Sequence, residues 1–483
     1  MSADSGPETR SGPASVGRGT GAWLVLVATA LAATMDGLDA TGLSVANPAI
    51  ARDLHASLPS LQAITTGYMV AMAASVIVVG KVGDRYGHRR VFLIGLAGFA
   101  VSSALVGLSS TATEMVLWRV AQGVSGAMLA ANAVALLRHT FPPDRFKLAV
   151  GLFSGGLALA SLGGPFLGGA LVEYLSWRAI FFVNLPIAAV AGILAVLHAP
   201  RHTRADVGGR LDISGVVVLA VAVAALVSGV SRAGAYGWGG MYPIAAFVAA
   251  IVLLVRFVRI ERSAADPVVP LDLFRSRQSC LALAVILAGG LTHFGSAYYF
   301  ALYLQQFRGL SPLAAGASLL PMLGLVAFGG PLSGLLNQRY GPRLPVTAGL
   351  TLLAAGAVGL SVTGLDARLI ALIPWLLPMG LGVGLALPTA TAIVVSQAPA
   401  EHAGAASGLQ HTVLMVSGAL AVSVLGAIIT ASAPQYADIA VVQDPTAFLT
   451  GLRHAFLTGA ALTATTATLY LCGTRPADTQ RAT

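Results

Sequence analysis

The chain has 483 residues, of which 56% are hydrophobic and only 10% are charged, and its mean hydropathy is +0.81. This composition excludes a soluble globular domain of this length and indicates a polytopic membrane protein. The net charge of +9 comes from Lys and Arg residues that lie mainly in short segments between apolar runs, without any nucleic-acid motif. We therefore expect a lipid bilayer, and no nucleic acid, as the partner of these charges.

The first 22 residues are rich in Ser, Gly and Pro, and the apolar run that follows lacks a convincing cleavage site. We predict a disordered cytoplasmic tail over residues 1–22 and an uncleaved first helix. Fourteen apolar runs are about 18 to 25 residues long, which is the length of a transmembrane helix. They begin near Trp23, Leu61, Val91, Thr113, Leu148, Ala179, Ile213, Met241, Leu281, Pro312, Pro345, Leu369, Ala403 and Arg453.

The cationic residues are distributed unevenly between the two sides of the predicted bundle. If the N-terminus is cytoplasmic, the tails and inward loops hold 21 of the 28 Lys and Arg residues, and the outward loops hold 6. The remaining one is Arg119, inside the fourth run. Because cationic loops resist translocation, this asymmetry predicts that both termini are cytoplasmic. The expected location is the cytoplasmic membrane of a bacterium.

The first apolar run contains two acidic residues, Asp36 and Asp39, three positions apart and therefore on one helix face. A carboxylate inside a bilayer costs about 2.5–3.5 kcal/mol on insertion scales, so such residues usually have a function. We predict that the pair binds and releases protons as a coupled unit. For Asp36 alone, the alternative is a side chain that points into a water-filled outer vestibule.

Arg119 lies in the fourth run at the same expected depth as Asp39. At 1.5 Å per residue, each lies about 10 Å below the outer helix ends at Ala46 and Ala112. An arginine at that depth stays charged and needs a carboxylate or carbonyl partner. Pairing with Asp39 that depends on protonation would act as a switch, and the alternative is a static buried salt bridge.

The loop after the second run, Gly80-Lys-Val-Gly-Asp-Arg-Tyr-Gly-His-Arg89, aligns without gaps with Gly334-Leu-Leu-Asn-Gln-Arg-Tyr-Gly-Pro-Arg343, 254 residues later. Each copy follows the second helix of a six-helix half, so two extra helices separate two lobes. We predict a first lobe over 23–198, a linker with two helices over 199–279, a second lobe over 280–472 and a cytoplasmic tail over 473–483.

The first copy of this loop is a candidate cytoplasmic gate. Its glycines permit a tight turn, and Asp84 can accept hydrogen bonds from a helix N-terminus or pair with Arg89 or a neighbouring helix. The alternative is a solvated cationic loop that only sets the topology. Gln338 replaces the acid in the second copy, which predicts a weaker latch there. The candidate gate residues are Gly80, Gly83, Asp84, Arg85, Gly87 and Arg89.

The fifth run carries small residues every four positions, at Ala160, Gly164 and Gly168. They form a flat stripe against which another helix can pack closely, while Pro165 removes a backbone hydrogen bond and favours bending. Together with Gly169, these residues form a candidate seam for sliding between the lobes. Ordinary tight packing without a conformational role is the alternative.

The ninth run contains an aromatic cluster that is a candidate wall for an amphiphilic substrate, because pockets are commonly lined by aromatic side chains and a few polar groups. Only about half of such residues are expected to line a cavity, since lipid-facing aromatics look the same in a sequence. His293 and His411 offer a second proton site or, alternatively, hydrogen bonds to a facing helix. The candidate substrate-binding residues are Trp118, Gln122, His293, Phe294, Tyr298, Tyr299, Trp375 and His411.

Five local patterns occur in a fixed order: Leu38 to Pro48, Gly80 to Arg90, Leu117 to Gly126, Ala160 to Gly169 and Trp177 to Pro186. Together they resemble the fourteen-helix drug/proton antiporter family of the major facilitator superfamily. Asp39 matches the acidic position of the first pattern, and the Ala160 pattern is similar to the one associated with antiporters. Ser44 and Asn47 depart from the first pattern, where Asn and Leu are usual.

The resemblance implies a major facilitator fold, all-α and polytopic, with two six-helix lobes plus two inserted helices. It also implies a proton-coupled antiporter that exports small lipophilic drugs or antibiotics by alternating access, and not an enzyme. A proton-coupled uptake symporter for a small metabolite is the first alternative, because a fold does not assign direction. A membrane sensor or scaffold that transports nothing is the second.

Several motifs are absent from the sequence. It has no G-x-x-x-x-G-K-[ST] loop and no cluster with metal-ligand spacing, so we expect no cofactor, no metal and transport driven by protons. The tenth run, Pro312 to Leu336, contains no acid, which favours neutral, monocationic or weakly anionic substrates. We expect the protein to act as a monomer.

Overall fold

The computed structural model describes residues 20–200, 213–263, 271–363, 368–398, 403–432 and 445–474. The ordered elements of the first half are α1 (Thr20–Leu54), α2 (Leu58–Tyr86), α3 (His88–Leu108), α4 (Ala112–Thr140), α5 (Pro143–Tyr174), α6 (Ala179–Phe182), α7 (Asn184–His198), α8 (Ile213–Tyr236) and α9 (Met241–Ser263). Those of the second half are η1 (Leu271–Arg275), α10 (Arg277–Gln306), α11 (Pro312–Tyr340), α12 (Arg343–Val362), α13 (Leu369–Ser396), α14 (Ala403–Ser432) and α15 (Pro445–Gly473).

The predicted all-α membrane fold is confirmed. Thirteen helices in the described ranges are long and apolar enough to cross a membrane, and α8 carries a further apolar stretch at Val217–Ala233. Within those ranges the chain contains no strand. Such a structure satisfies every backbone hydrogen bond inside its own helix, which a bilayer requires.

The helix bounds differ from the predicted ones in two ways. Several helices have 28 to 35 residues, because their polar ends continue beyond the hydrocarbon, and α15 begins at Pro445 rather than near Arg453. The predicted sixth span is divided into α6 and α7 at Val183. Pro186 has no N–H to donate to the Phe182 carbonyl four residues earlier, which explains this break.

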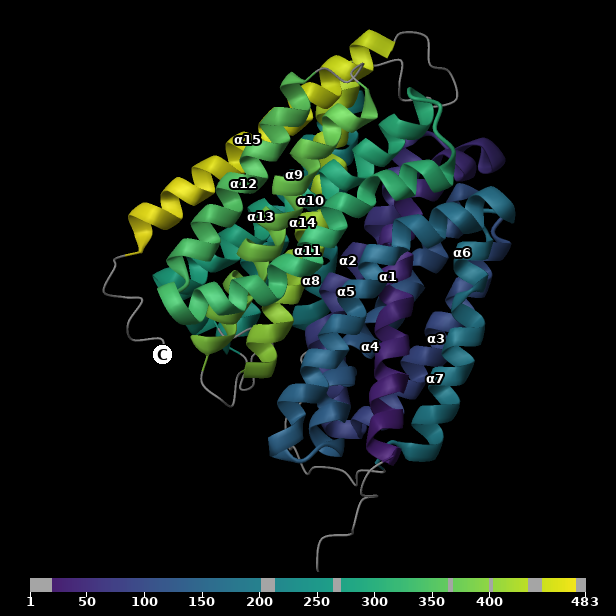
Figure 1. The fold of residues 1–483 in the computed structure, drawn as a ribbon, viewed down its shortest axis with the longest axis vertical. Coiled ribbons are helices and arrows are strands. Elements are labelled where there is room, and N and C mark those ends of the chain that lie inside the picture. The colour runs from purple at the N-terminus through teal and green to yellow at the C-terminus, as the bar shows by residue number, and fades with distance from the viewer. Residues whose placement is uncertain are drawn as a thin grey trace, which may run out of the picture.

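The helices form two groups, shown in Figure 1 by the purple-to-blue and the green-to-yellow ribbons. We call α1–α7 the N lobe and α10–α15 the C lobe, since the helices within each group pack against one another. Contacts between the lobes run mainly from α5 to α11 and from α2 to α14. These two pairs of helices therefore form the main boundary between the lobes.

Helix α8 lies across one junction between the lobes. It packs against α9, α2 and α14, and the Ser231 and Ser423 hydroxyls are 2.6 Å apart. We propose the division into two lobes and a two-helix linker on these contacts. The predicted tails and linker loops fall largely on 1–19, 201–212, 264–270 and 475–483, outside the described residues.

Helices α5 and α11 approach each other closely near one end. A methyl group added at Gly169 would overlap the Pro312 carbonyl, and one at Gly316 would overlap the Pro165 carbonyl. Toward the opposite end, Gly155 on α5 and Gly330 on α11 have nothing within 4 Å of such a group. These two glycines lie toward the end of the bundle at which α1 begins, the lower end in Figure 1, where α2 and α14 stay in contact through the Thr412 hydroxyl, which donates to the Ala73 carbonyl at 2.9 Å.

A capping box sets the start of α4. The Thr111 hydroxyl accepts a hydrogen bond from the Glu114 amide at 3.2 Å, and the Glu114 carboxylate accepts from the amides of Ser110 and Thr111. Since α4 then begins at Ala112, Arg119 lies two turns inside the helix, about 10 Å from its end. Local sequence thus places this arginine within the bilayer.

Candidate functional site

An ion pair lies buried between α1 and α4. Arg119 donates from Nη1 to Asp39 Oδ2 and, at 2.8 Å, to Gln122 Oε1, and its Nε donates to the Ile64 carbonyl at 3.3 Å. Asp39 and Arg119 are each only 1% exposed. The two residues predicted at one depth therefore meet, and the low dielectric around them makes their interaction strong.

Aromatic rings complete the surroundings of the guanidinium. Its central carbon lies 4.3 Å from the ring centre of Tyr68 and 6.0 Å from that of Phe181, both within cation–π range. The Tyr68 hydroxyl donates to Asp36, which is partly buried. Asp36 and Asp39 therefore have different partners, and Tyr68 links them.

Polar contacts extend from Asp39 into the interior of the N lobe. Gln122 Nε2 donates to Asp39 Oδ1 at 3.0 Å and to Ser103 Oγ at 2.7 Å, and Asn184 Nδ2 donates to Ser103 Oγ at 3.2 Å. Sequence reasoning missed Ser103 and Tyr68, which carry no signal, and treated Asn184 only as part of a family pattern. We call Asp39, Arg119, Gln122, Ser103 and Asn184 the polar network.

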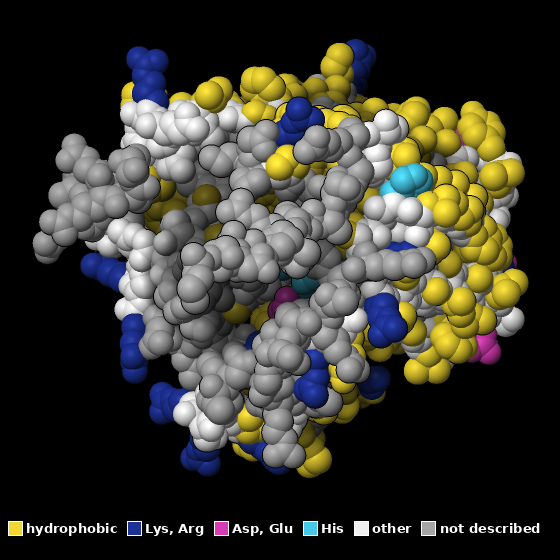
Figure 2. All heavy atoms as spheres, turned by 90° about the horizontal axis from the view of Figure 1, so that it is seen from below, with side chains coloured by type: hydrophobic (Ala, Val, Ile, Leu, Met, Phe, Trp, Pro, Cys, Tyr) yellow, Lys and Arg dark blue, Asp and Glu magenta, His cyan; other side chains and the backbone are white. Residues whose placement is uncertain are grey.

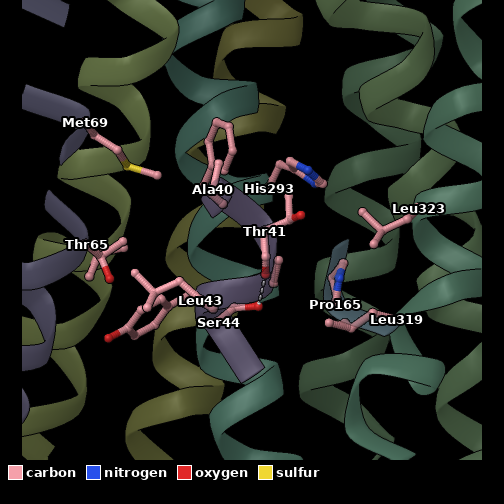
Figure 3. Close-up of a pocket in the computed structure, with 14 residues that line it drawn as sticks. Ala40, Thr41, Leu43, Ser44, Thr65, Met69, Pro165, His293, Leu319 and Leu323 are labelled. Atoms are coloured by element: carbon pink, nitrogen blue, oxygen red, sulfur yellow. Dashed lines mark hydrogen bonds between the residues drawn. The ribbon is translucent and has the colours of Figure 1, made fainter. Parts of the chain in front are cut away.

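A pocket lies between the two lobes, as Figure 3 shows. Helices α1, α2 and α5 contribute one side, and α10, α11 and α14 contribute the other. Its lining residues are Ala40, Thr41, Leu43, Ser44, Thr65, Met69, Pro165, His293, Phe294, Ala297, Tyr298, Leu319, Leu323 and Val422. Most are apolar, with a few hydroxyls and one imidazole, as is usual for sites that bind amphiphilic molecules.

Three of the predicted substrate-binding residues, His293, Phe294 and Tyr298, line this pocket. Tyr299 does not, because its hydroxyl points the other way, accepting from Gln62 Nε2 at 2.9 Å and donating to the Val422 carbonyl at 2.5 Å. Of the wider aromatic cluster, Phe300 and Tyr303 are buried in the core of the C lobe. Two of the five aromatic residues of this cluster therefore line the cavity; the cluster comprises Phe294, Tyr298, Tyr299, Phe300 and Tyr303.

The other predicted substrate-binding residues lie elsewhere. Gln122 belongs to the polar network, and His411 is absent from the lining, with its Nε2 buried and without a hydrogen-bond partner in the described structure. Trp118 and Trp375 are each 37% exposed and also absent from the lining. Trp118 directly precedes Arg119 in α4. Neighbouring residues are rotated by about 100° around a helix, so the Trp118 side chain points away from the interior position of Arg119. None of these four residues lines this pocket, and a role for them in substrate binding stays a prediction.

Neither aspartate lines the pocket, although their neighbours Ala40 and Thr41 do. Asp39 points from α1 toward α4, whereas Thr41 and Ser44 on the same helix line the pocket, with the Thr41 hydroxyl next to Gly164 of α5. The ion pair and the pocket therefore lie on two faces of α1, and any communication between them passes through this helix.

The predicted seam on α5 has two faces. Ala160, Gly164 and Gly168 pack against α1, where a methyl group at Gly164 would overlap the Thr41 hydroxyl and one at Gly168 would lie 2.9 Å from Gly42 Cα. Gly169 and Pro165 instead meet α11 across the lobe boundary. The stripe thus forms close contacts within the N lobe, and only its last part reaches the other lobe.

The candidate gate lies where α2 ends and α3 begins. Asp84 Oδ1 lies 3.2 Å from His88 Nε2, one turn along the chain, and the predicted pairing of Asp84 with Arg89 is not found. Arg89 instead donates to the carbonyls of Ala195 at 3.3 Å and Val196 at 2.5 Å. A cation at the C-terminus of α7 offsets the negative end of that helix, which explains its position.

The repeated loop keeps this contact in the C lobe. Arg343, which corresponds to Arg89, donates to the Leu471 carbonyl near the end of α15 at 3.1 Å. In each copy an arginine also lies over the following tyrosine ring, Arg85 over Tyr86 at 5.7 Å and Arg339 over Tyr340 at 5.3 Å. The internal repeat is therefore structural as well as sequential.

Two further gate glycines differ in the space around them. A methyl group at Gly83 would overlap Asn132 Oδ1, whereas one at Gly80 would lie 3.9 Å from Ala131 Cβ. Gly87 has φ of +93°, a conformation that other residues adopt with strain.

Gly87→Ala is expected to lower the free energy of unfolding by about 1–3 kcal/mol, because alanine is strained at this φ. Thermal unfolding in detergent, followed by fluorescence, would measure the loss. Gly80→Ala is the control, since its new methyl group has room. An equal loss in both variants would show that the turn geometry is unimportant.

The described residues contain no group of three or more His, Cys, Asp or Glu side chains that could hold a metal ion. Cys280 and Cys472 are both free and exposed. The chemistry available at the site is therefore that of carboxylates, one guanidinium, hydroxyls, amides and imidazoles.

The sequence pattern of the Major Facilitator Superfamily matches residues 29–422. The chain is 40% identical over 406 residues to the tetracenomycin C resistance and export protein of Streptomyces glaucescens, covering 84% of this chain and 75% of that protein. It is 33% identical over 412 residues to multidrug resistance protein Stp of Mycobacterium tuberculosis, covering 84% and 76%.

A solved structure has the same fold. The crystal structure of a bacterial homologue of the human lysosomal transporter Spinster, inward-facing and unoccupied, matches with a TM-score of 0.68 at 15% identity. The match covers 96% of this chain and 99% of that chain. Together with the pattern match and the two lobes around a central pocket, it leads to one conclusion. The chain belongs to the Major Facilitator Superfamily, a family of multi-pass membrane transporters.

Proposed function

We propose that the protein is an antiporter that exports small lipophilic compounds in exchange for protons. The observation that carries this proposal is the Asp39–Arg119 pair, buried at membrane depth one helix away from a pocket between the lobes. Export agrees with the names of its relatives, which confer resistance to tetracenomycin C and to multiple drugs. Intramembrane ionisable groups of this kind commonly carry protons in transporters.

Protonation of Asp39 is the step that would change the electrostatic interaction between Asp39 and Arg119. Among the residues that the structure describes, Asp39 is the carboxylate that contacts Arg119, and its protonation leaves the guanidinium with the Gln122 oxygen and the Ile64 carbonyl. A charge that loses its partner in a low dielectric is costly, by about 3–5 kcal/mol when a buried pair is broken. Each proton that moves inward releases about 2.3 kcal/mol per 100 mV of membrane potential. This free energy is comparable in size to the cost of breaking the buried ion pair.

Helix α1 would transmit this change to the substrate. Asp39 holds one face of α1 against α4, while Thr41 and Ser44 on the other face line the pocket. Because the proton and the substrate do not share a carboxylate, they would not compete directly for one side chain. A movement of α1 along the α5 glycines would couple the two sites.

In this proposal, the described conformation would be the stage that admits substrate from the cytoplasm. The lobes meet at the upper end, where Gln305 Nε2 donates to the Val45 carbonyl at 3.0 Å and the Leu313 amide donates to Glu173 at 3.1 Å. Basic residues end α2 and α11 at the opposite end, and Figure 2 shows Lys and Arg side chains around that face. Cationic loops remain cytoplasmic, which supports this orientation.

The test is proton movement in proteoliposomes. 2,7-Dihydroxynaphthalene, an uncharged aromatic compound with two hydroxyl groups, would be added to vesicles that enclose a pH-sensitive dye, with and without an imposed pH gradient. We expect antiport, in which an acidic lumen drives the added compound into the vesicle as protons leave. Movement of both in the same direction would favour an uptake symporter, and no substrate-dependent flux would favour a sensor or scaffold.

A further inference from the structure

The pocket between the lobes carries no ionised carboxylate or ammonium group. None of its fourteen lining residues is Asp, Glu, Lys or Arg. The two nearby carboxylates are already engaged within the N lobe, Asp36 by the Tyr68 hydroxyl and Asp39 by Arg119. A charged ligand would therefore enter a low-dielectric site without a partner of opposite charge, which is unfavourable.

The hydroxyls on the N-lobe side present oxygen lone pairs to the pocket. Thr41 donates its hydroxyl hydrogen to the Gly37 carbonyl at 2.6 Å, Ser44 donates to the Thr41 carbonyl at 2.7 Å, and Thr65 donates to the Leu61 carbonyl at 3.2 Å. Each hydroxyl donates its single hydrogen to a carbonyl of its own helix, and its oxygen can still accept a hydrogen bond from a ligand. This wall matches a ligand that brings hydrogen-bond donors.

The C-lobe side supplies two polar side chains, His293 and Tyr298, and the Tyr298 hydroxyl is also buried without a hydrogen-bond partner in the described structure. Figure 3 shows His293 above Thr41, on the same side as Leu323. Its Nδ1 is buried and has no hydrogen-bond partner in the described structure. An unpaired buried nitrogen is costly unless a ligand or water completes it.

The remaining lining suits a flat apolar body. The Phe294 and Tyr298 side chains contribute aromatic surface, and Met69 contributes a flexible thioether that adapts to irregular shapes. Leu319 and Leu323 on α11 close the other side. The pocket thus combines aromatic and aliphatic walls with hydroxyl acceptors on the N-lobe side and an imidazole and a phenol hydroxyl on the C-lobe side.

We propose that this pocket selects uncharged aromatic compounds that carry hydroxyl groups, and that His293 is the residue that recognises them from the C lobe. The inference rests on the proposed function, because it names the substrate class of the same site. It also narrows the range expected from the sequence, which included monocationic and weakly anionic compounds.

The first experiment compares three two-ring compounds of similar size with the purified protein in lipid nanodiscs. They are 2,7-dihydroxynaphthalene, its dimethyl ether and the cation N-methylquinolinium, with binding followed by calorimetry at pH 7. We expect the diol to bind at least tenfold more tightly than the ether, and the cation not to bind measurably. Equal binding of the cation and the diol would overturn the proposed class.

The second experiment isolates His293. His293→Leu is expected to weaken diol binding about tenfold and to leave ether binding unchanged, because only the diol uses the imidazole. His411→Leu is the matched control, since this partly buried histidine lies outside the pocket lining. An equal loss in the two variants would show that His293 has only a structural role.

A gain-of-function variant keeps the inference testable if those variants fold poorly. Leu319→Glu places a carboxylate in the lining and is expected to give measurable binding of N-methylquinolinium; continued absence of binding would contradict the electrostatic argument. The proton-release assay distinguishes failure of the proposed substrate class from failure of the proposed antiport function. Proton release triggered by the cation in the unmodified protein would refute the substrate class alone, whereas no release with any compound would refute antiport itself.

Discussion

Asp39→Asn is expected to reduce substrate-induced proton release to the background of empty vesicles, while substrate binding changes less than threefold. Asparagine has nearly the same shape and can still accept from Arg119 and Gln122, but it cannot gain or lose a proton. Binding should persist because Asp39 does not line the pocket. The variant would therefore resemble a carrier locked in its protonated form.

Proteoliposomes with an enclosed pH-sensitive dye would measure coupling, and calorimetry would measure binding. Asp53→Asn is the matched control, since Asp53 lies on the same helix but outside the polar network, where it accepts from Arg178 and, at 3.0 Å, from Trp177. Asp53→Asn should keep its coupling. Normal proton release from Asp39→Asn would remove this residue from the mechanism.

Gly164→Leu is expected to lower transport at least tenfold, because even the first carbon of the new side chain would overlap the Thr41 hydroxyl. The clash would separate α5 from α1 at a close contact between the two helices, next to the pocket. A separation of this kind would prevent α1 from moving along α5 without requiring the lobes to unfold.

Gly163→Leu is the control for this prediction, because a methyl group there meets only Leu167 of its own helix, at 3.5 Å. Expression and thermal unfolding in detergent would show whether each variant folds. Transport by Gly164→Leu at the normal rate would mean that the close contact between α1 and α5 plays no part in the cycle.

Local sequence was sufficient to predict the number of helices and the depth of the buried charges. Hydropathy and length are properties of each segment, so the bilayer requirement identifies spans without knowledge of their neighbours. The constant rise of a helix then placed Asp39 and Arg119 at one depth, and the structure brings them together. The repeated loop likewise indicated two related halves before any packing was known.

Only the tertiary structure decided which way each side chain points. Membrane helices are apolar on every side, so their sequence gives no preferred face, and a rotation of 100° per residue separates neighbours such as Trp118 and Arg119. This is why Gln122 was expected at the substrate and lies beside Asp39, and why Thr41, Ser44 and Thr65 were overlooked.

The separation of the ion pair from the pocket is the clearest result of this kind. The sequence determined that α1 carries two acids and a small polar stretch, but not that Asp39 and Thr41 lie on different faces of the packed helix. The sequence also could not predict that α8 packs against both α2 and α14. Both depend on how helices rotate and dock, which is set by contacts between segments distant in the chain.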